Sequence, residues 1–561
     1  MRTGDGTIGG VPTVSDVSGG GQHRSQPEDG LVLPSHEDPV VGNLSTVIGG
    51  PPGPRARLGD PRWWLPIRVL IFFAVLACTL SWVNKSLCVT HGYGHEYQYT
   101  RLCYSDVYAL YYAEGLNTGK VPILDNITPA PDSQGVVHPK YVEYPVIVGG
   151  LMGAAEGLAH TLVGTTTGEQ RAIDAGARPD ATEAEKAAAT AARGHLEARQ
   201  AKFFFNSTAA FLLICGVIVV VLTGLTAGRR RIWDAALVGL APALVLHADV
   251  NWDLAAVAFT AGAVFAWSRR APAVAGMLLG LGVATKFYPV LLLIPLFALC
   301  LRAGQLRAFW RMFSAAVLAW SVTCIPVWVA NPAGFGRFYA FSRSRGPEYN
   351  SLLYAFQYLA WGPNHGWDPG KPVPNWLNFW SGFFLVVALV GIVALIMLAP
   401  VRPRLGQVAF LTIFAFLLTN KVYSPQYVLW ILPFVALARP RWRFWLVWQA
   451  TEILLLITLY SHLIYADTGG NKGIPYPAFF YFGDLPRDVA LLVLSGLVVR
   501  EALHPELDIV RADGTDDPAG GVLDEAPDRF QPPARREQRP PGGFAEISMY
   551  PSQYPSGPYP G

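Results

Sequence analysis

Long apolar runs separated by short polar or charged stretches recur along the chain between residues 64 and 499. Runs of this kind reach the length of about 20 helical residues that crosses the hydrocarbon core of a bilayer. The pattern predicts an all-α polytopic membrane protein over residues 61–502, a bundle of about 12 transmembrane helices with outer-face loops and interfacial helices. Residues 1–60 and 503–561 are predicted to be disordered cytoplasmic tails, because such polar, Pro- and Gly-rich sequence cannot bury a core.

Composition agrees with lipid as the solvent of most of the chain. Of the 561 residues, 52% are hydrophobic and only 15% are charged, whereas soluble domains carry about 25% charged residues. The net charge of +3 comes from Arg and Lys clusters between the apolar runs. These clusters report membrane topology and give no basic face, so no nucleic acid partner is expected.

The basic clusters orient the bundle, since positive charge stays on the cytoplasmic side of a membrane. Clusters at residues 229–231, 269–270 and 302–311, with others near residues 402 and 441, are therefore predicted to face the cytoplasm together with both termini. The stretches between the clusters must then face outward, and polar and aromatic residues return on that face. We expect a multi-pass protein of the plasma membrane with an outward-facing active site.

Two segments do not fit a simple count of crossings. Residues 145–164 have the pattern of a helix but carry Glu156 and His160. A full crossing here would place the cluster at residues 229–231 outside, so we predict a partly inserted or interfacial helix. The Ala-rich, charged residues 168–202 are helical by propensity but lack a wide apolar face, which predicts a surface excursion.

Two of the six cysteines, Cys88 and Cys103, fall in the first outward loop. The compartment outside the membrane favours disulfides, so these two are expected to be bonded. The other four lie in apolar runs, where a free thiol behaves as a small hydrophobe. A disulfide in so short a loop would constrain the chain just before Asp106.

The first outward loop contains the sequence Cys-Tyr-Ser-Asp-Val-Tyr and later Val-Glu-Tyr-Pro, which together contribute Asp106, Tyr108, Glu143 and Tyr144. Transfer of a sugar needs a carboxylate that takes the proton of the incoming hydroxyl. Asp106 or Glu143 is the candidate catalytic base, and the two tyrosines are candidate substrate ligands. The alternative is that either acid only caps the short helix that follows Ser105.

A second outward patch holds His247, Asp249, Asn251 and Asp253 between two apolar runs. Ionisable residues at membrane level are costly and usually functional. The two aspartates are four residues apart and could share a helical face, but a metal site would need further oxygen ligands, so no metal is expected. Binding of sugar hydroxyls, or a helix cap by Asp253, is favoured.

Two more outward patches combine a lysine with tyrosines at a predicted helix break. The third contains Lys286 and Tyr288, and the fourth contains Lys421, Tyr423 and Gln426. Lys286 could neutralise a lipid phosphate, although a lysine that reaches from a helix end to the headgroups is the alternative.

The outward loop between these two patches carries Arg337, Arg343 and Arg345. A leaving phosphate needs fixed positive charge and hydrogen-bond donors, which guanidinium supplies in bidentate geometry. Any one of these arginines could instead be a headgroup anchor. Because all four patches lie on one face, they predict a single substrate pocket.

The order of these motifs resembles the GT-C glycosyltransferases. Ser-Asp, Gly-Lys-Val-Pro, Glu-Tyr-Pro, Asn-Trp-Asp, Thr-Lys-Phe-Tyr-Pro and Tyr-Ser-Pro-Gln-Tyr follow one another over residues 64–499. They look most like family 87, which includes polyprenyl-phosphate-mannose-dependent mannosyltransferases of actinobacteria. The resemblance implies a polyprenyl-phosphate sugar as donor, an inverting displacement without nucleotide or cofactor, and Asp106 as general base. Mannose is the favoured sugar and arabinofuranose is possible, with an envelope glycolipid or polysaccharide as acceptor.

A transporter or flippase for lipid-linked sugars is the main alternative, since charge within a membrane would serve it equally well. Secondary transporters usually contain internal repeats and helices broken near the midplane. No repeat is evident in this sequence, and the polar patches gather on one face. A purely structural membrane protein would leave the recurring Asp, Lys and Tyr residues without a role. The sequence therefore favours an enzyme.

Overall fold

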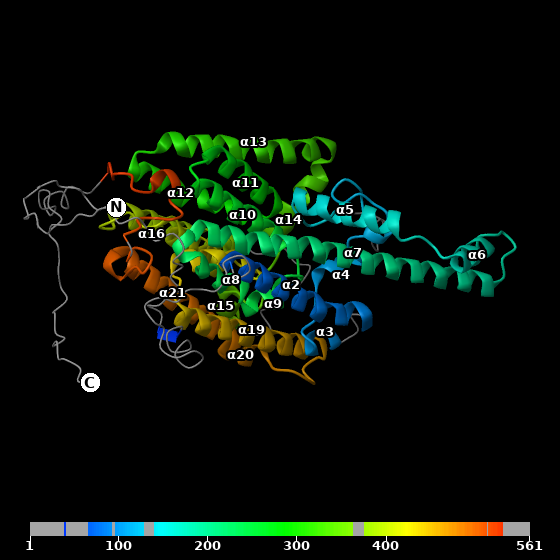
Figure 1. The fold of residues 1–561 in the computed structure, drawn as a ribbon. Helices are drawn as coiled ribbons and strands as arrows, with labels where there is room; N and C mark the ends of the chain where they lie inside the picture. Colours follow the sequence, from blue (N-terminus) through cyan, green and yellow to red (C-terminus); the bar gives the residue numbers. More distant parts are fainter. Residues whose placement is uncertain are drawn as a thin grey trace, which may run out of the picture.

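The computed structural model describes residues 39–40, 65–91, 96–127, 140–362, 375–512 and 514–530. Within these residues every regular element is a helix (Figure 1). The prediction of an all-α membrane protein is confirmed. The prediction for residues 1–60 lies outside the described residues except for residues 39–40.

The helices of the first half are α2 (Pro66–His91), α3 (Tyr97–Thr100), α4 (Asp106–Ala113), η1 (Leu116–Thr118), α5 (Val146–Leu162), α6 (Thr167–Gly176), α7 (Glu183–Ala227), η2 (Arg229–Ala235), α8 (Ala236–Gly239), α9 (Pro242–His247), α10 (Asp253–Ser268) and α11 (Pro272–Thr285). The second half contains η3 (Tyr288–Leu292), α12 (Leu293–Ala303), α13 (Leu306–Ala330), α14 (Pro332–Ser344), α15 (Leu352–Trp361), α16 (Asn375–Leu398), α17 (Leu405–Thr419), η5 (Pro425–Tyr427), α18 (Val428–Ala438), α19 (Trp442–Asp467), α20 (Tyr476–Phe479), η6 (Phe480–Asp484), α21 (Leu485–Leu503), η7 (Pro505–Leu507) and η8 (Gly521–Leu523).

Five helices of the described chain are long and apolar enough to cross a membrane, namely α2, α7, α13, α16 and α19. A sixth candidate is the pair α5 and α6, which bends by 94° and forms either a broken span or a re-entrant loop. Other apolar helices, such as α10 and α17, have 10–17 residues and are shorter than the usual span. The count of about 12 crossings, like the interfacial placement of α5, stays a prediction.

The centre of the bundle is formed by short apolar helices. Every residue of α18 is buried, and α10 and α17 are buried over most of their length. On α11, a Cβ at Gly276 would lie 2.0 Å from the Met312 carbonyl oxygen, and one at Gly280 would lie 2.3 Å from that of Ala316. These glycines therefore let α11 and α13 pack backbone to backbone. By contrast, α13 and α16 are mostly exposed along their apolar windows, as lipid-facing helices should be.

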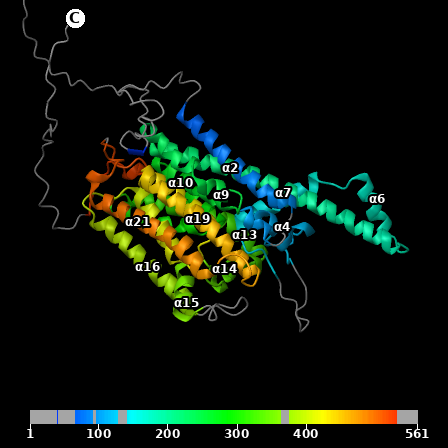
Figure 2. The same ribbon diagram turned by 90° about the horizontal axis from the view of Figure 1, so that it is seen from below.

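The segment 168–202 forms part of a helical hairpin that projects from the bundle (Figures 1 and 2). It consists of α6 and the first part of α7, and each helix begins with a capping box, at Thr166 and at Thr182. Arg199 of α7 donates to both carboxylate oxygens of Glu169 on α6. The expectation of helical structure outside the bundle agrees with the structure.

The prediction that residues 503–561 are a disordered tail is wrong for residues 503–512 and 514–530. Asp508 is buried and accepts from Arg404 at 2.7 and 3.0 Å, and Asp517 accepts from the backbone N–H of Leu405 at 2.7 Å. This segment packs because its acids pair with arginines more than 100 residues earlier, which compensates for its few apolar residues. Residues 531–561 lie outside the described residues.

Candidate functional site

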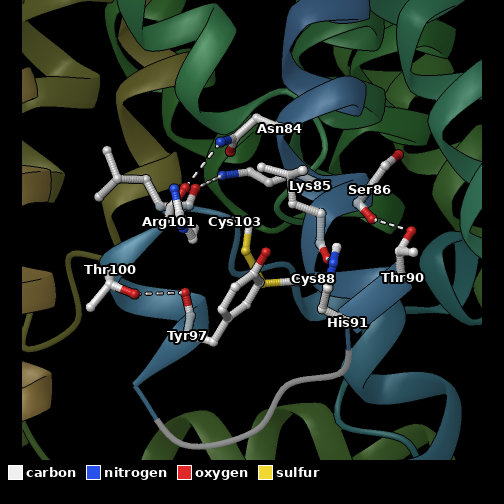
Figure 3. Close-up of a disulfide and its surroundings, with 12 residues drawn as sticks. Asn84, Lys85, Ser86, Cys88, Thr90, His91, Tyr97, Thr100, Arg101 and Cys103 are labelled. Atoms are coloured by element: carbon white, nitrogen blue, oxygen red, sulfur yellow. Dashed lines mark hydrogen bonds between the residues drawn. A yellow bond between two sulfur atoms is a disulfide. The ribbon is translucent and has the colours of Figure 1, made fainter.

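The first outward loop is tied to α2 immediately before Asp106. Cys103 forms a disulfide with Cys88 of α2 (Figure 3). Beside it, the Lys85 ammonium group donates to the carbonyl of Leu102 at 2.8 Å. The expected disulfide is thus present in the structure, and these contacts determine where α4 begins.

One side chain of the same loop and one side chain of the second patch hold the Asp106 carboxylate. The Tyr104 hydroxyl donates to Oδ1 at 2.6 Å, and the Asn251 amide donates to Oδ2 at 2.8 Å. The Asp106 N–H also donates to the Val250 carbonyl at 2.8 Å, which joins the first outward loop to the second patch. The carboxylate is therefore oriented by tertiary contacts, and Ser105, the residue that precedes α4, makes no side-chain cap.

Asn251 is the centre of the site. Its Nδ2 donates to Asp106 and also to the Tyr144 hydroxyl, at 2.8 Å in each case. Its Oδ1 accepts from the Lys286 ammonium group at 3.3 Å and from the Trp252 N–H at 2.7 Å. One buried amide thus connects the first three sequence patches.

Lys286 lies in a cage of acidic and aromatic groups. Its Nζ is 3.5 Å from Oδ1 of Asp253, 5.2 Å from the centre of the Tyr144 ring and 6.0 Å from that of Tyr427. Asp253 also accepts from the Trp430 indole N–H at 2.7 Å. A cation is therefore fixed close to the Asp106 carboxylate.

Tyr104 and Tyr144, which both belong to the first outward loop, stay protonated. The negative charge of Asp106, together with burial, raises the pKa of Tyr104, and burial raises the pKa of Tyr144. The Tyr104 hydroxyl consequently acts as a donor to the carboxylate, and Tyr144 can accept from Asn251.

The other cations of the predicted site have different surroundings. Arg345 forms an ion pair with Glu348, and it lies within electrostatic range of Tyr427, Tyr144 and, most weakly, Asp106. Lys421 lies next to Arg345, whose charge adds to burial in lowering the Lys421 pKa to about 8.

Arg337 forms an ion pair with Glu143. These two predicted site residues are therefore partners of each other. Arg343 is exposed and takes part in the loop through its carbonyl, which accepts from Lys421 at 2.9 Å. Of the two candidate bases, Asp106 is the one that joins the other patches.

The remaining predicted residues lie elsewhere. Asp249 is near Lys85 and Ser81, and His247 is also near Lys85. Asp249 and Asp253 do not share a helical face, because residues 248–252 form a turn and the two carboxylates have different partners.

Four predicted tyrosine and glutamine ligands have contacts or burial of their own outside the Asp106–Asn251–Lys286 network. Tyr108 packs against Tyr112, with ring centres 6.0 Å apart. Tyr288 is buried against Trp430 and shares a hydrogen bond with Thr260. Finally, Tyr423 and Gln426 are buried in the fourth patch.

A small, narrow apolar pocket opens beside Tyr144. It lies between the start of α5, the end of α11, α13 and α14, and its wall is mostly aromatic and aliphatic. The lining residues are Ile123, Tyr144, Pro145, Val146, Val283, Ala284, Trp320, Cys324, Phe335, Phe338 and Tyr339. In the described part of the chain, no group of three or more His, Cys, Asp or Glu side chains could hold a metal ion.

Sequence reasoning missed several residues of this site. Trp430 lies inside an apolar run, and only its spacing of three residues from Tyr427 could have drawn attention to it. Lys85 was a clearer signal, because a lysine within the first apolar run has to be satisfied by a partner. Glu348 follows Arg345 by three residues, which is the spacing of an ion pair.

Comparisons with known proteins give two matches. The model of glycosyltransferase family 87 matches residues 189–420. GPI mannosyltransferase 1 of Eremothecium gossypii is 26% identical over 253 residues, which cover 42% of this chain. The chain spans only 58% of the length of that relative. No solved structure matches the chain.

The family match includes Asn251, Asp253 and Lys286, whereas Asp106 lies before it in the sequence. The hydrogen bond between Asp106 and Asn251 joins the unmatched first loop to the matched segment. Residues 189–420 therefore match glycosyltransferase family 87, and the predicted resemblance of this chain to that family is confirmed.

Proposed function

We propose that this chain is a membrane glycosyltransferase that moves a sugar from a polyprenyl-phosphate carrier to a cell-envelope glycolipid or polysaccharide at the outer face of the plasma membrane. One observation carries the proposal: Asn251 donates to the carboxylate of Asp106 and accepts from Lys286. A proton acceptor and a phosphate-neutralising cation thus lie on either side of a single amide. Mannose is the favoured sugar, supported by the name of the matched relative, and arabinofuranose is the second choice.

In this reaction the acceptor hydroxyl attacks the anomeric carbon from the face opposite the carrier, so the anomeric configuration is inverted. The carbon–oxygen bond to the phosphate breaks, and the phosphate leaves with the bonding electron pair. Asp106 takes the hydroxyl proton as general base. Lys286 and Arg345 stabilise the negative charge that develops on the phosphate.

The apolar pocket beside Tyr144 supports a lipid carrier as donor. Its aromatic and aliphatic wall is apolar, as isoprene units are, and Tyr144 lies between this wall and Asn251. A carrier chain lying along the wall would bring its phosphate to the Lys286 side of the site. The exposed apolar surface of α13, which lines the pocket, gives it a route from the membrane.

The experiment is sugar transfer by the purified full-length protein in lipid nanodiscs, with a short-chain polyprenyl-phosphate mannose and an envelope glycolipid extract. Asp106→Asn keeps the shape of the side chain and removes the base, so the rate should fall by about 10² to 10⁴-fold. Asp174→Asn on the exposed hairpin is the matched control and should leave the rate unchanged.

Near-normal transfer by Asp106→Asn would remove Asp106 from its role as base. Transfer from a nucleotide sugar but not from the lipid donor would overturn the donor class. Movement of the carrier across the bilayer without any transfer would instead favour a flippase.

A further inference from the structure

Two outer segments of the chain, residues 345–351 and 420–427, are joined to each other, and we call the pair the outer clamp. The backbone N–H of Glu348 in the first segment donates to the carbonyl of Lys421 in the second, at 2.9 Å. The segments belong to different parts of the fold, since the first follows α14 and the second follows α17. Their relative position therefore depends on contacts such as this one.

The side chain of Glu348 makes the second set of contacts across the outer clamp. Each carboxylate oxygen accepts from the Ser424 hydroxyl at 2.9 Å. The same carboxylate forms an ion pair with the guanidinium group of Arg345. One residue thus fixes Arg345 and the segment that carries Lys421.

Arg487 of α21 supports the outer clamp from the buried side. Its side chain is fully buried and pairs with Asp484 and, at 2.7 Å, with Asp488. It donates to the Asn350 carbonyl at 3.0 Å, and its guanidinium carbon lies 3.9 Å from the centre of the Tyr423 ring. Asn350 and Tyr423 belong to different segments of the outer clamp, so Arg487 contacts both.

The outer clamp is electrostatically continuous with the Asp106 site. Arg345 interacts with Asp106, and Lys421 interacts with Arg345. Two neighbouring cations repel each other, and the negative charge of Glu348 between their segments offsets this repulsion. The arrangement concentrates positive charge at one edge of the site without letting the two cations separate.

We propose that Glu348 is a positioning residue that holds Arg345 and Lys421 as a pair for the phosphate of the lipid carrier. This inference rests on the proposed function and adds a specific role to a residue outside the Asp106 cluster. The carboxylate of Glu348 contacts Ser424 and Arg345, one in each segment of the outer clamp, which is the arrangement of a positioning residue. A guanidinium group has five N–H donors, so Arg345 keeps donors for phosphate while it is paired.

The test measures binding of farnesyl phosphate and of farnesol to the full-length protein in nanodiscs. The two probes share the isoprenoid chain and differ in the phosphate. Wild-type protein should prefer farnesyl phosphate. Glu348→Gln keeps the side-chain shape but loses the charge, so affinity for farnesyl phosphate should fall by about tenfold, the effect of one charge-assisted contact. Affinity for farnesol should not change.

Ser424→Ala is the second variant, and it should change the phosphate preference in the same direction but less, since it removes a neutral donor. Glu183→Gln, an exposed residue of the hairpin, is the matched control and should behave as wild type. An equal loss of affinity for farnesyl phosphate and for farnesol in Glu348→Gln and Ser424→Ala would mean a general structural defect and would overturn the proposal.

If both variants keep the wild-type preference for farnesyl phosphate, the positioning role is overturned and the proposed function stays intact. A wild-type protein without that preference would contradict the donor class itself, and the positioning role would fall with it. The two failures are therefore distinguishable.

Discussion

The end of the bundle that is predicted to face the cytoplasm, which we call the cytoplasmic end, and the opposite end, which we call the outer end, both bury charged side chains. They satisfy these side chains differently. At the cytoplasmic end, Arg404 donates to Asp508 at 2.7 and 3.0 Å and to the carbonyls of Leu437 and Ala438 at 2.6 and 2.7 Å. At the outer end, the polar contacts of Lys286 are longer, at 3.3 and 3.5 Å. Short and numerous contacts indicate a cation that holds the fold together. An ammonium group has three N–H donors, so Lys286, with two longer contacts, keeps a donor for a ligand.

The largest expected effect is on stability at the cytoplasmic end. Asp508→Ala leaves Arg404 buried without its acid, which should cost about 3–5 kcal/mol of unfolding free energy. Denaturant unfolding of the detergent-solubilised protein measures this cost. Glu506→Ala, an exposed residue in the same segment, is the control and should unfold as wild type. An unchanged midpoint for Asp508→Ala would show that the C-terminal segment does not stabilise the bundle.

At the outer end the expected effect is on rate instead. Lys286→Ala should weaken stabilisation of the transition state by about 3 kcal/mol, as for the loss of an oxyanion donor. It should cost less stability than Asp508→Ala, because Asp253 keeps its hydrogen bond from the Trp430 indole. The measurement is donor kinetics at saturating acceptor, with unfolding followed in parallel. Lys472→Ala tests the specificity of the effect, because Lys472 is an exposed outer lysine paired with Glu96. A loss of stability equal to the loss of rate would erase the contrast between the two ends.

The disulfide gives a smaller, local effect on the outer end. Replacing both Cys88 and Cys103 by serine should lower the unfolding free energy by up to about 3 kcal/mol, the chain-entropy value for a loop of about 15 residues. Activity should fall with it, since the loop leads into Asp106. Mass spectrometry of the unreduced protein should find the two cysteines linked. Recovery of both as free thiols would remove the disulfide from the account of the site.

The smallest effect is a pH dependence. Burial and the charge of Arg345 lower the Lys421 pKa to about 8. Lysine is charged below its pKa, so the Lys421 charge is present at neutral pH and is lost as the pH rises through about 8. Affinity for a phosphate-bearing donor should therefore fall on the alkaline side. Lys421→Arg should keep its charge and remove this fall, and an identical pH profile in the variant would contradict a role for Lys421.

Much of the fold could be predicted because its signals are local. Apolar runs predict the helices. The capping boxes of the hairpin follow from a Thr at the start of a helix with a Glu three residues later, as at Thr182 and Glu185. The packing of residues 503–530 could not be predicted, since it depends on pairs such as Asp508 with Arg404 that are 104 residues apart. No local pattern indicates such a partner.

For the site, the residue types were predictable and their roles were not. The patches that hold Asp106, Asn251 and Lys286 were all identified from polar residues between apolar runs. One turn, residues 248–252, decides which residues of these patches contact each other. It directs Asn251 toward Asp106 and leaves Asp249 near Lys85. Periodicity cannot give the direction of side chains in such a turn.

The length of α7 has a mechanical consequence. Its 45 residues form one unbroken helix, so the hairpin outside the bundle and the span inside it are a single rod. Along this rod, the Phe204 ring lies 5.1 Å from Tyr111 of α4 and 6.4 Å from Trp252, the neighbour of Asn251. The exposed hairpin and the aromatic wall behind the Asn251 amide are therefore parts of the same helix.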